Sequence, residues 1–177
     1  MTVQPAELSR MVDARYIDAK PFVVEASKAE REALAERFGI VSIESLVAEI
    51  ALHKDGAAVR GSGPLRAAVV QSCAVSGEDF PVSIDEKLEL IFVRDGEVEA
   101  TPDEEIELDA DELDEIPFTG DRFDLGEAVA QSLALAIDPY AEGPNADRVR
   151  KEKALGSDDA PNGPLAEALA AFRSNDG

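Results

Sequence analysis

The sequence predicts an α+β fold in which an antiparallel β-meander sheet carries two amphipathic helices, followed by a C-terminal tail. Residues 40–93 are rich in β-branched residues and in stretches that alternate between apolar and polar side chains, as strands with one buried face do. A segment with helical apolar spacing lies on each side of this region. Packing both helices against the twisted sheet is the economical way to bury their apolar stripes.

The first helix is expected within the stretch SKAEREALAERFG. Ser27 and Glu30 have the spacing of a capping box, in which each side chain accepts a hydrogen bond from the backbone N–H of the other residue. Gly39 can adopt the left-handed conformation that ends a helix. A strand is expected just before it, near residues 21–26.

Four strands of the meander are then expected, at roughly 40–52, 57–61, 65–75 and 81–93. A helix is the alternative for the first, but its β-branched residues and the turn signal KDG that follows it favour a strand. The stretch GSGP at 61–64 allows a bend or bulge, and SGED joins the last two strands as a hairpin.

The second helix is expected within FDLGEAVAQSLALAIDP. Asp124 is its predicted N-cap, and Glu127 would complete a capping box. A wide apolar stripe along this segment indicates a buried face, and Pro139 stops the helix. The stretch EIPFTGDRF before it is expected to form one short final strand.

We expect residues 1–140 to form a single α+β domain and residues 141–177 to form a flexible linker that ends in a short amphipathic helix. A helix as short as PLAEALAAF is marginal on its own in water. It therefore either packs back on the domain or binds a partner. In the second case Leu165, Leu169 and Phe172 would be its anchors.

The charge of the chain indicates the kind of partner it binds. Thirty-eight acidic residues outnumber 17 basic ones, which gives a net charge of −21. This charge disfavours nucleic acid and anionic membranes and favours basic proteins. Twelve of the 21 residues from Asp95 to Glu115 are acidic and none is basic. This segment is either a solvated acidic loop or a docking element, whose candidate partner-binding carboxylates are Asp103, Glu104, Glu105, Glu107, Asp109 and Asp111.

No catalytic residue, cofactor or metal site is expected. His53 is the only histidine and should be an exposed residue beside a turn, while Cys73 is the only cysteine and should be a small buried apolar residue. A zinc site needs four ligands, typically cysteine or histidine. The acidic segment also lacks the glycine and glutamate positions of an EF-hand. A cytoplasmic location is expected, because no signal-peptide core or membrane-spanning apolar run is visible.

Several stretches together resemble the YceD family, named for large ribosomal RNA subunit accumulation. They are ELSR, EASKAEREALAERFGIVSIESLVAEIAL, LRAAVVQSCAVSGEDFPVSIDEKLELIFV and FDLGEAVAQSLALAIDPY, in the order of the family and across most of residues 7–140. The residues that carry the family motifs are Cys73, Ser76, Asp124, Leu125, Gly126 and Glu127. Many members have a C-x-x-C in the hairpin. The resemblance implies that Cys73, with Ser76 at the second position, is the remnant of a metal knuckle.

The resemblance implies a non-enzymatic role in ribosome biogenesis, linked to accumulation of the 23S rRNA of bacteria and plastids. The family's gene commonly neighbours that of a small basic ribosomal protein. We therefore expect a basic ribosomal protein or assembly factor as the partner. The alternative is a direct RNA-binding module of large-subunit assembly that uses Arg60, Arg66 and the basic run at 148–153.

Overall fold

The computed structural model describes residues 7–95 and 115–153. The predicted partner-binding residues between 103 and 111, and those between 165 and 172, lie outside this part of the chain. No helix in the described ranges is long and apolar enough to cross a membrane.

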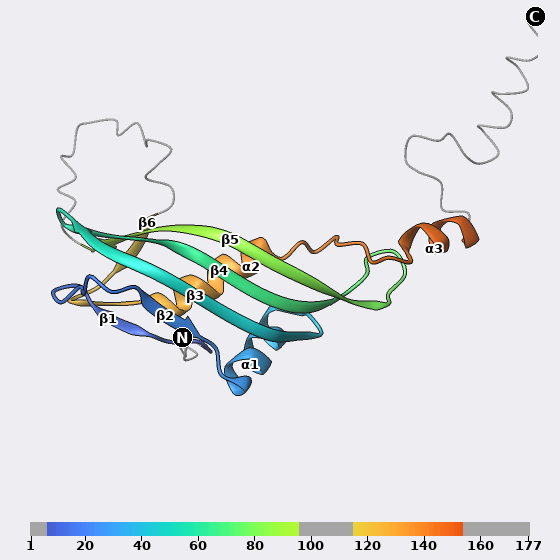
Figure 1. Cartoon of the computed structure of the whole chain (residues 1–177), viewed down its shortest axis with the longest axis horizontal. Helices are drawn as coiled ribbons and strands as arrows, with labels where there is room; N and C mark the ends of the chain where they lie inside the picture. Colours follow the sequence, from blue (N-terminus) through green and yellow to red (C-terminus); the bar gives the residue numbers. More distant parts are fainter. Residues whose placement is uncertain (1–6, 96–114, 154–177) are drawn as a thin grey trace, which may run out of the picture. The chain divides into compact units, whose positions relative to one another are not determined.

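The main sheet has five strands in the order β2-β3-β4-β5-β6 (Figure 1). Their bounds are Phe22–Glu25 for β2, Ser42–Asp55 for β3, Ala58–Ser72 for β4, Asp79–Arg94 for β5 and Glu115–Phe118 for β6. The strand predicted near residues 21–26 is confirmed as β2, and the first meander strand is confirmed as β3. The α+β class is confirmed as well. The sheet is mixed rather than purely antiparallel, because β6 pairs in parallel with the end of β5.

A single long strand, β4, replaces the two strands predicted at 57–61 and 65–75. The glycine at position 63 does not break the strand; it lets β4 approach β3 closely. A Cβ atom at Gly63 would lie 1.8 Å from the backbone oxygen of Glu49. The GSG stretch therefore marks a close contact between two backbones, one of the roles that glycine has inside strands.

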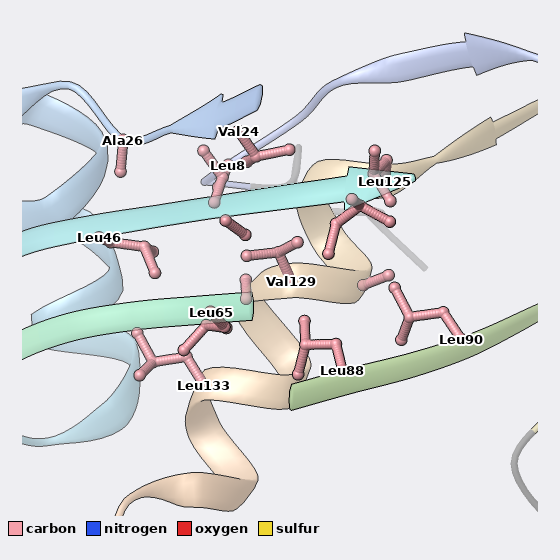
Figure 2. Packing of buried hydrophobic residues seen from close by; sticks show 14 of the residues in the cluster. Leu8, Val24, Ala26, Leu46, Leu65, Leu88, Leu90, Leu125, Val129 and Leu133 are labelled. Atoms are coloured by element: carbon pink, nitrogen blue, oxygen red, sulfur yellow. The ribbon is translucent and has the colours of Figure 1, made fainter. Parts of the chain in front are cut away.

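The core lies between the sheet and helix α2, Leu125–Ala136. Figure 2 shows side chains of α2, among them Val129 and Leu133, next to Leu65 and Leu88 of the sheet. The apolar stripe predicted for α2 is thus buried. Helix α1, Lys28–Phe38, contacts β3 and buries Leu34 and Ala35.

A second, two-stranded sheet was not expected. It consists of β1, Met11–Asp13, and β7, Arg122–Asp124, which pair antiparallel. The one strand predicted within EIPFTGDRF is therefore two strands, β6 and β7, separated by a turn at Gly120, whose φ is +77°. Three-residue strands are too short to show a periodic pattern, and for this reason the sequence did not reveal them.

Helix α3, Ala146–Glu152, lies in the segment that reads as a linker. Buried Ala146 and Val149 and an ion pair between Arg148 and Glu152 (2.9 Å) support it. The chain divides into two compact units. One comprises the described residues up to Gln71 and those between Pro81 and Pro139, and the other comprises Ser72–Phe80 together with the described residues from Tyr140 onward.

Candidate functional site

The motif residue Asp124 caps helix α2 as predicted. Its Oδ1 atom accepts hydrogen bonds from the backbone N–H groups of Gly126 (3.0 Å) and Glu127 (3.2 Å). The same carboxylate accepts from the backbone N–H of Arg10 (2.8 Å) and from the hydroxyl of Ser9 (2.6 Å). One side chain thus joins the start of the helix to the N-terminal segment of the domain.

The capping box predicted for Glu127 is wrong. Its carboxylate binds Arg37 of α1 instead, at 2.8 and 3.1 Å, and this guanidinium lowers the pKa of Glu127. Arg37 also donates to Glu7 (2.9 Å). A two-pronged guanidinium is a stronger partner for a carboxylate than a single backbone N–H. The carboxylate therefore turns toward α1.

The box predicted at the start of α1 is confirmed, because Ser27 and Glu30 each accept from the backbone of the other. Glu30 also binds Arg10 at 2.7 Å, and the pKa of Glu30 is lowered to about 2, chiefly by this hydrogen bond. Arg10 and Arg37 could not be identified from the sequence as partners of these motifs, because each lies far along the chain from the residue it binds.

Gly126 is packed closely against the backbone of the N-terminal segment. A Cβ atom at this position would lie 2.7 Å from the backbone N of Arg10 and 2.8 Å from the backbone O of Leu8. The D-L-G-E motif is therefore a structural joint that packs the segment around Leu8 to Arg10 onto α2.

Replacing Gly126 by alanine is expected to lower the free energy of unfolding by about 2 kcal/mol, through overpacking against a backbone. Helix propensity alone predicts the opposite sign, since alanine is favoured over glycine by about 1 kcal/mol. Urea unfolding of the variant measures the difference. Ser132→Ala on the same helix is the control and should change stability by less than about 0.5 kcal/mol; a more stable Gly126→Ala variant would disprove the close packing.

The other motif residue, Cys73, lies in a tight turn after β4 and is 3% exposed, as expected for a buried apolar residue. The turn is closed by hydrogen bonds from the backbone N of Cys73 to the O of Glu78 and from the N of Gly77 to the O of Cys73, both 2.9 Å. The Sγ atom accepts from the backbone N–H groups of Val75 (3.4 Å) and Ser76 (3.3 Å).

Ser76 occupies the position where the family pattern implies a second cysteine. Its hydroxyl and its backbone N–H, together with the N–H groups of Gly143 and Val75, stabilise the thiolate and lower the pKa of Cys73 to about 7. Within residues 7–95 and 115–153, no three His, Cys, Asp or Glu side chains are grouped so as to hold a metal ion. Hydrogen bonds hold this turn together.

The segment after α2 also packs against the Cys73 turn. The backbone N of Ala74 donates to the O of Ala141 (3.1 Å), and the side chain of Asn145 donates to Glu78 (2.7 Å). A Cβ atom at Gly143 would lie 3.0 Å from the ring of Phe80. Packing and hydrogen bonds thus join the Cys73 turn to the segment that follows Pro139, both of which belong to the same compact unit.

Replacing Ser76 by alanine is expected to raise the pKa of Cys73 above about 7, because the largest stabilising contact to the thiolate is lost. The folded pKa lies below the ordinary value of 9.0, so the thiolate stabilises the fold above about pH 9, and this contribution is lost as the pH falls through about 7. Ultraviolet absorbance of the thiolate measures the pKa cleanly, because the chain has one cysteine. Ser72→Ala is the control, and an identical titration of wild type and Ser76→Ala would refute the contact.

His53 is exposed on β3, as predicted. It lines an open depression of about 370 Å³ on the sheet together with Arg60, Ser62 and Glu89. Cys73 is not among the residues that line it. The charged side chains there are already paired, Arg60 with Asp55 at 2.6 Å and Glu89 with Lys87 at 2.8 Å.

The arginines that would form an RNA-binding face are paired with acids of the chain itself. Arg60 binds Asp55, and Arg66 lies 3.6 Å from Asp85. In α3, Arg148 binds Glu152 and Arg150 binds Glu142. These contacts lower the positive potential that a phosphate backbone would meet.

Comparison with known protein families matches residues 61–165, more than half of the chain, to the family described as large ribosomal RNA subunit accumulation protein YceD. Neither a search of the curated proteins nor a search of the solved structures found a match.

Proposed function

Because the chain belongs to the YceD family of large ribosomal RNA subunit accumulation proteins, we propose that it is a non-enzymatic ribosome biogenesis factor. It supports the accumulation and processing of 23S rRNA by binding a basic ribosomal protein or assembly factor through its acidic surface. The family description supports the link to large-subunit RNA, and the charge of the chain supports the kind of partner.

One observation carries the choice of partner: the chain's own acids engage its cations. Eight arginines of the described ranges make ion pairs within the chain. They are Arg10, Arg15, Arg37, Arg60, Arg66, Arg94, Arg148 and Arg150. Since acids exceed bases by 21, many carboxylates remain without such a partner. In the part of the chain that the structure describes, Glu36, Glu49 and Glu86 are exposed and make no ion pair.

This excess of carboxylates would allow the chain to bind a basic protein reversibly before that protein binds RNA. Opposite charges speed the encounter of the two proteins and make their complex sensitive to salt. A ribosomal RNA has a still higher density of negative charge, and it would displace the acidic chain from its partner by releasing bound counterions. Such a chain keeps a basic protein soluble and then gives it up to the RNA.

Copurification with the tagged full chain tests this function. A basic ribosomal protein or assembly factor should be recovered at low salt, should remain after ribonuclease treatment, and should be lost at high salt. Recovery of no such protein at low salt would contradict the proposal. A gel shift with large-subunit RNA tests the alternative: RNA capture that persists at physiological salt would identify a direct RNA-binding module instead.

A further inference from the structure

Within the described part of the chain, most of the outer edge of strand β5 is not paired with another strand. On one side it neighbours β4, and on the other it pairs with β6 only from Ile91 to Arg94. Among the described residues, no strand pairs with the outer edge of Pro81–Leu90. At about 3.3 Å per residue, this edge is roughly 30 Å long. Its alternate N–H and C=O groups are available to another extended chain.

The side chains along this edge carry an excess of negative charge. Asp85, Glu86 and Glu89 are exposed, and Lys87 is the one cation among them. Lys87 is bound to Glu89 (2.8 Å), and Asp85 lies 3.6 Å from Arg66, whereas Glu86 makes no ion pair within the described ranges. Exposed edge strands often carry lysines, which disfavour pairing with another chain. On this edge acidic residues outnumber the single lysine.

We propose that the edge of β5 from Pro81 to Leu90 binds an extended, lysine- or arginine-rich segment of the basic partner as an added β-strand. This inference rests on the proposed function and identifies where and how the partner docks. Main-chain hydrogen bonds would supply much of the affinity, and alternate side chains would supply the selectivity.

The side-chain pattern of β5 predicts which residues the added strand should carry on each of its two faces. On the core side, Ile84 and Leu88 are 8% exposed, and Val82 is packed against the core at its margin. An added strand would therefore place small or apolar side chains on that side, where they extend the core. On the other side its lysines or arginines would lie opposite Asp85 and Glu89, since opposite charges on neighbouring strands attract.

Charge argues against the other possible occupants of this edge. A second copy of the chain would set the acids of one β5 against those of the other, and like charges on neighbouring strands destabilise the pair. Residues 96–114 contain acids and no base, and residues 154–177 contain four acids and one arginine. Neither segment complements the edge, whereas a basic peptide does.

The test uses the full chain and a labelled synthetic peptide of about ten residues in which lysine and valine alternate. Fluorescence anisotropy at low salt measures its binding. A second peptide has the same sequence with every backbone amide methylated, so that it keeps the charges but has no N–H donors. We expect the methylated peptide to bind at least about ten-fold more weakly, because strand addition requires these donors. Equal binding of the two peptides would overturn the inference.

Paired charge reversals test the position of the site. Asp85→Lys with Glu89→Lys should weaken peptide binding by about ten-fold or more, because these two carboxylates lie on the side of β5 that faces the partner's basic side chains. The matched control, Glu32→Lys with Glu36→Lys on α1, changes the net charge equally and should have a much smaller effect. Circular dichroism should show that both variants stay folded. An equal loss in both would mean non-specific attraction to an acidic surface and would overturn the inference.

Amide chemical shifts locate the peptide directly. They should change along Val82–Leu90, and changes confined to another part of the chain would contradict the inference. Dimers of the free chain that block the peptide would also contradict it. If the basic partner is copurified but both reversal pairs weaken its capture equally, the proposed function stands and only the β5 site falls.

Discussion

Replacing Phe123 by alanine is expected to lower the free energy of unfolding by about 3–5 kcal/mol, the usual cost of removing a buried phenyl ring. Phe123 is 2% exposed and stacks on Phe92, with ring centroids 4.1 Å apart. It also meets Phe118 at 5.6 Å. The chain has no tryptophan and only seven phenylalanines, so this cluster holds a large share of its aromatic rings. The three rings come from β5, β6 and β7, and the cluster therefore joins these strands in the core.

Urea unfolding of the full chain measures this effect. Tyr16→Ala provides the matched control, because that ring is 75% exposed and its loss should cost less than about 1 kcal/mol. If the two variants were equally stable, the aromatic cluster would not be part of the core.

Replacing Gly63 by alanine is expected to cost about 3 kcal/mol, at the upper end of the range for overpacking. The added methyl group would lie 1.8 Å from the backbone oxygen of Glu49 and 2.9 Å from its carbonyl carbon. Neither atom can move without separating β3 from β4. The contact is between two backbones, so no change of side-chain rotamer can relieve it.

Thermal and urea unfolding of the Gly63 variant should both report this loss. Ser62→Ala, at the adjacent position, is the control and should be nearly neutral, because it adds no atom at the contact between strands. A Gly63→Ala variant with wild-type stability would show that β3 and β4 do not approach each other closely at this position.

Helices α1 and α2 could be predicted because their signals are local. Ser27 and Glu30 form the expected capping box, and Gly39 ends α1 in the left-handed conformation with a φ of 66°. Asp124 caps α2, and the apolar stripe behind it is buried. Such signals lie within a few residues of each other, so one sequence is enough to detect them.

Other features depend on contacts between distant residues and could not be predicted. Glu127 has the spacing of a capping residue, but Arg37 attracts its carboxylate across the fold. The glycines at 61 and 63 look like a break in the chain, yet they let β4 run close to β3. Helix α3 lies in a polar stretch that resembles a linker. Ion pairs and two buried residues stabilise it, and neither is visible from the composition of the stretch.

The candidate site was predicted only in part. The sequence identified Cys73 as a buried apolar residue and His53 as an exposed one, and the structure confirms both. It could not show that the motif around Gly126 is a joint between α2 and the N-terminal segment, or that the acidic edge of Pro81–Leu90 pairs with no strand among the described residues. Both properties depend on which distant segments lie side by side in the fold, and spacing along the sequence does not show this.

If acidic charge is what this chain uses to support 23S rRNA, as we propose, then removing that charge should impair the maturation of the RNA in cells. The ratio of precursor to mature 23S rRNA is compared in a deletion strain that carries either the wild-type chain or a neutralised one. In the neutralised chain the carboxylates of both candidate docking regions are replaced by the matching amides. They are Asp85, Glu86 and Glu89 of β5 and Asp103, Glu104, Glu105, Glu107, Asp109 and Asp111 of the acidic segment. We expect the wild-type chain to restore mature 23S rRNA and the neutralised chain, equally folded and abundant, to fail. Full restoration by the neutralised chain would show that acidic charge is not required.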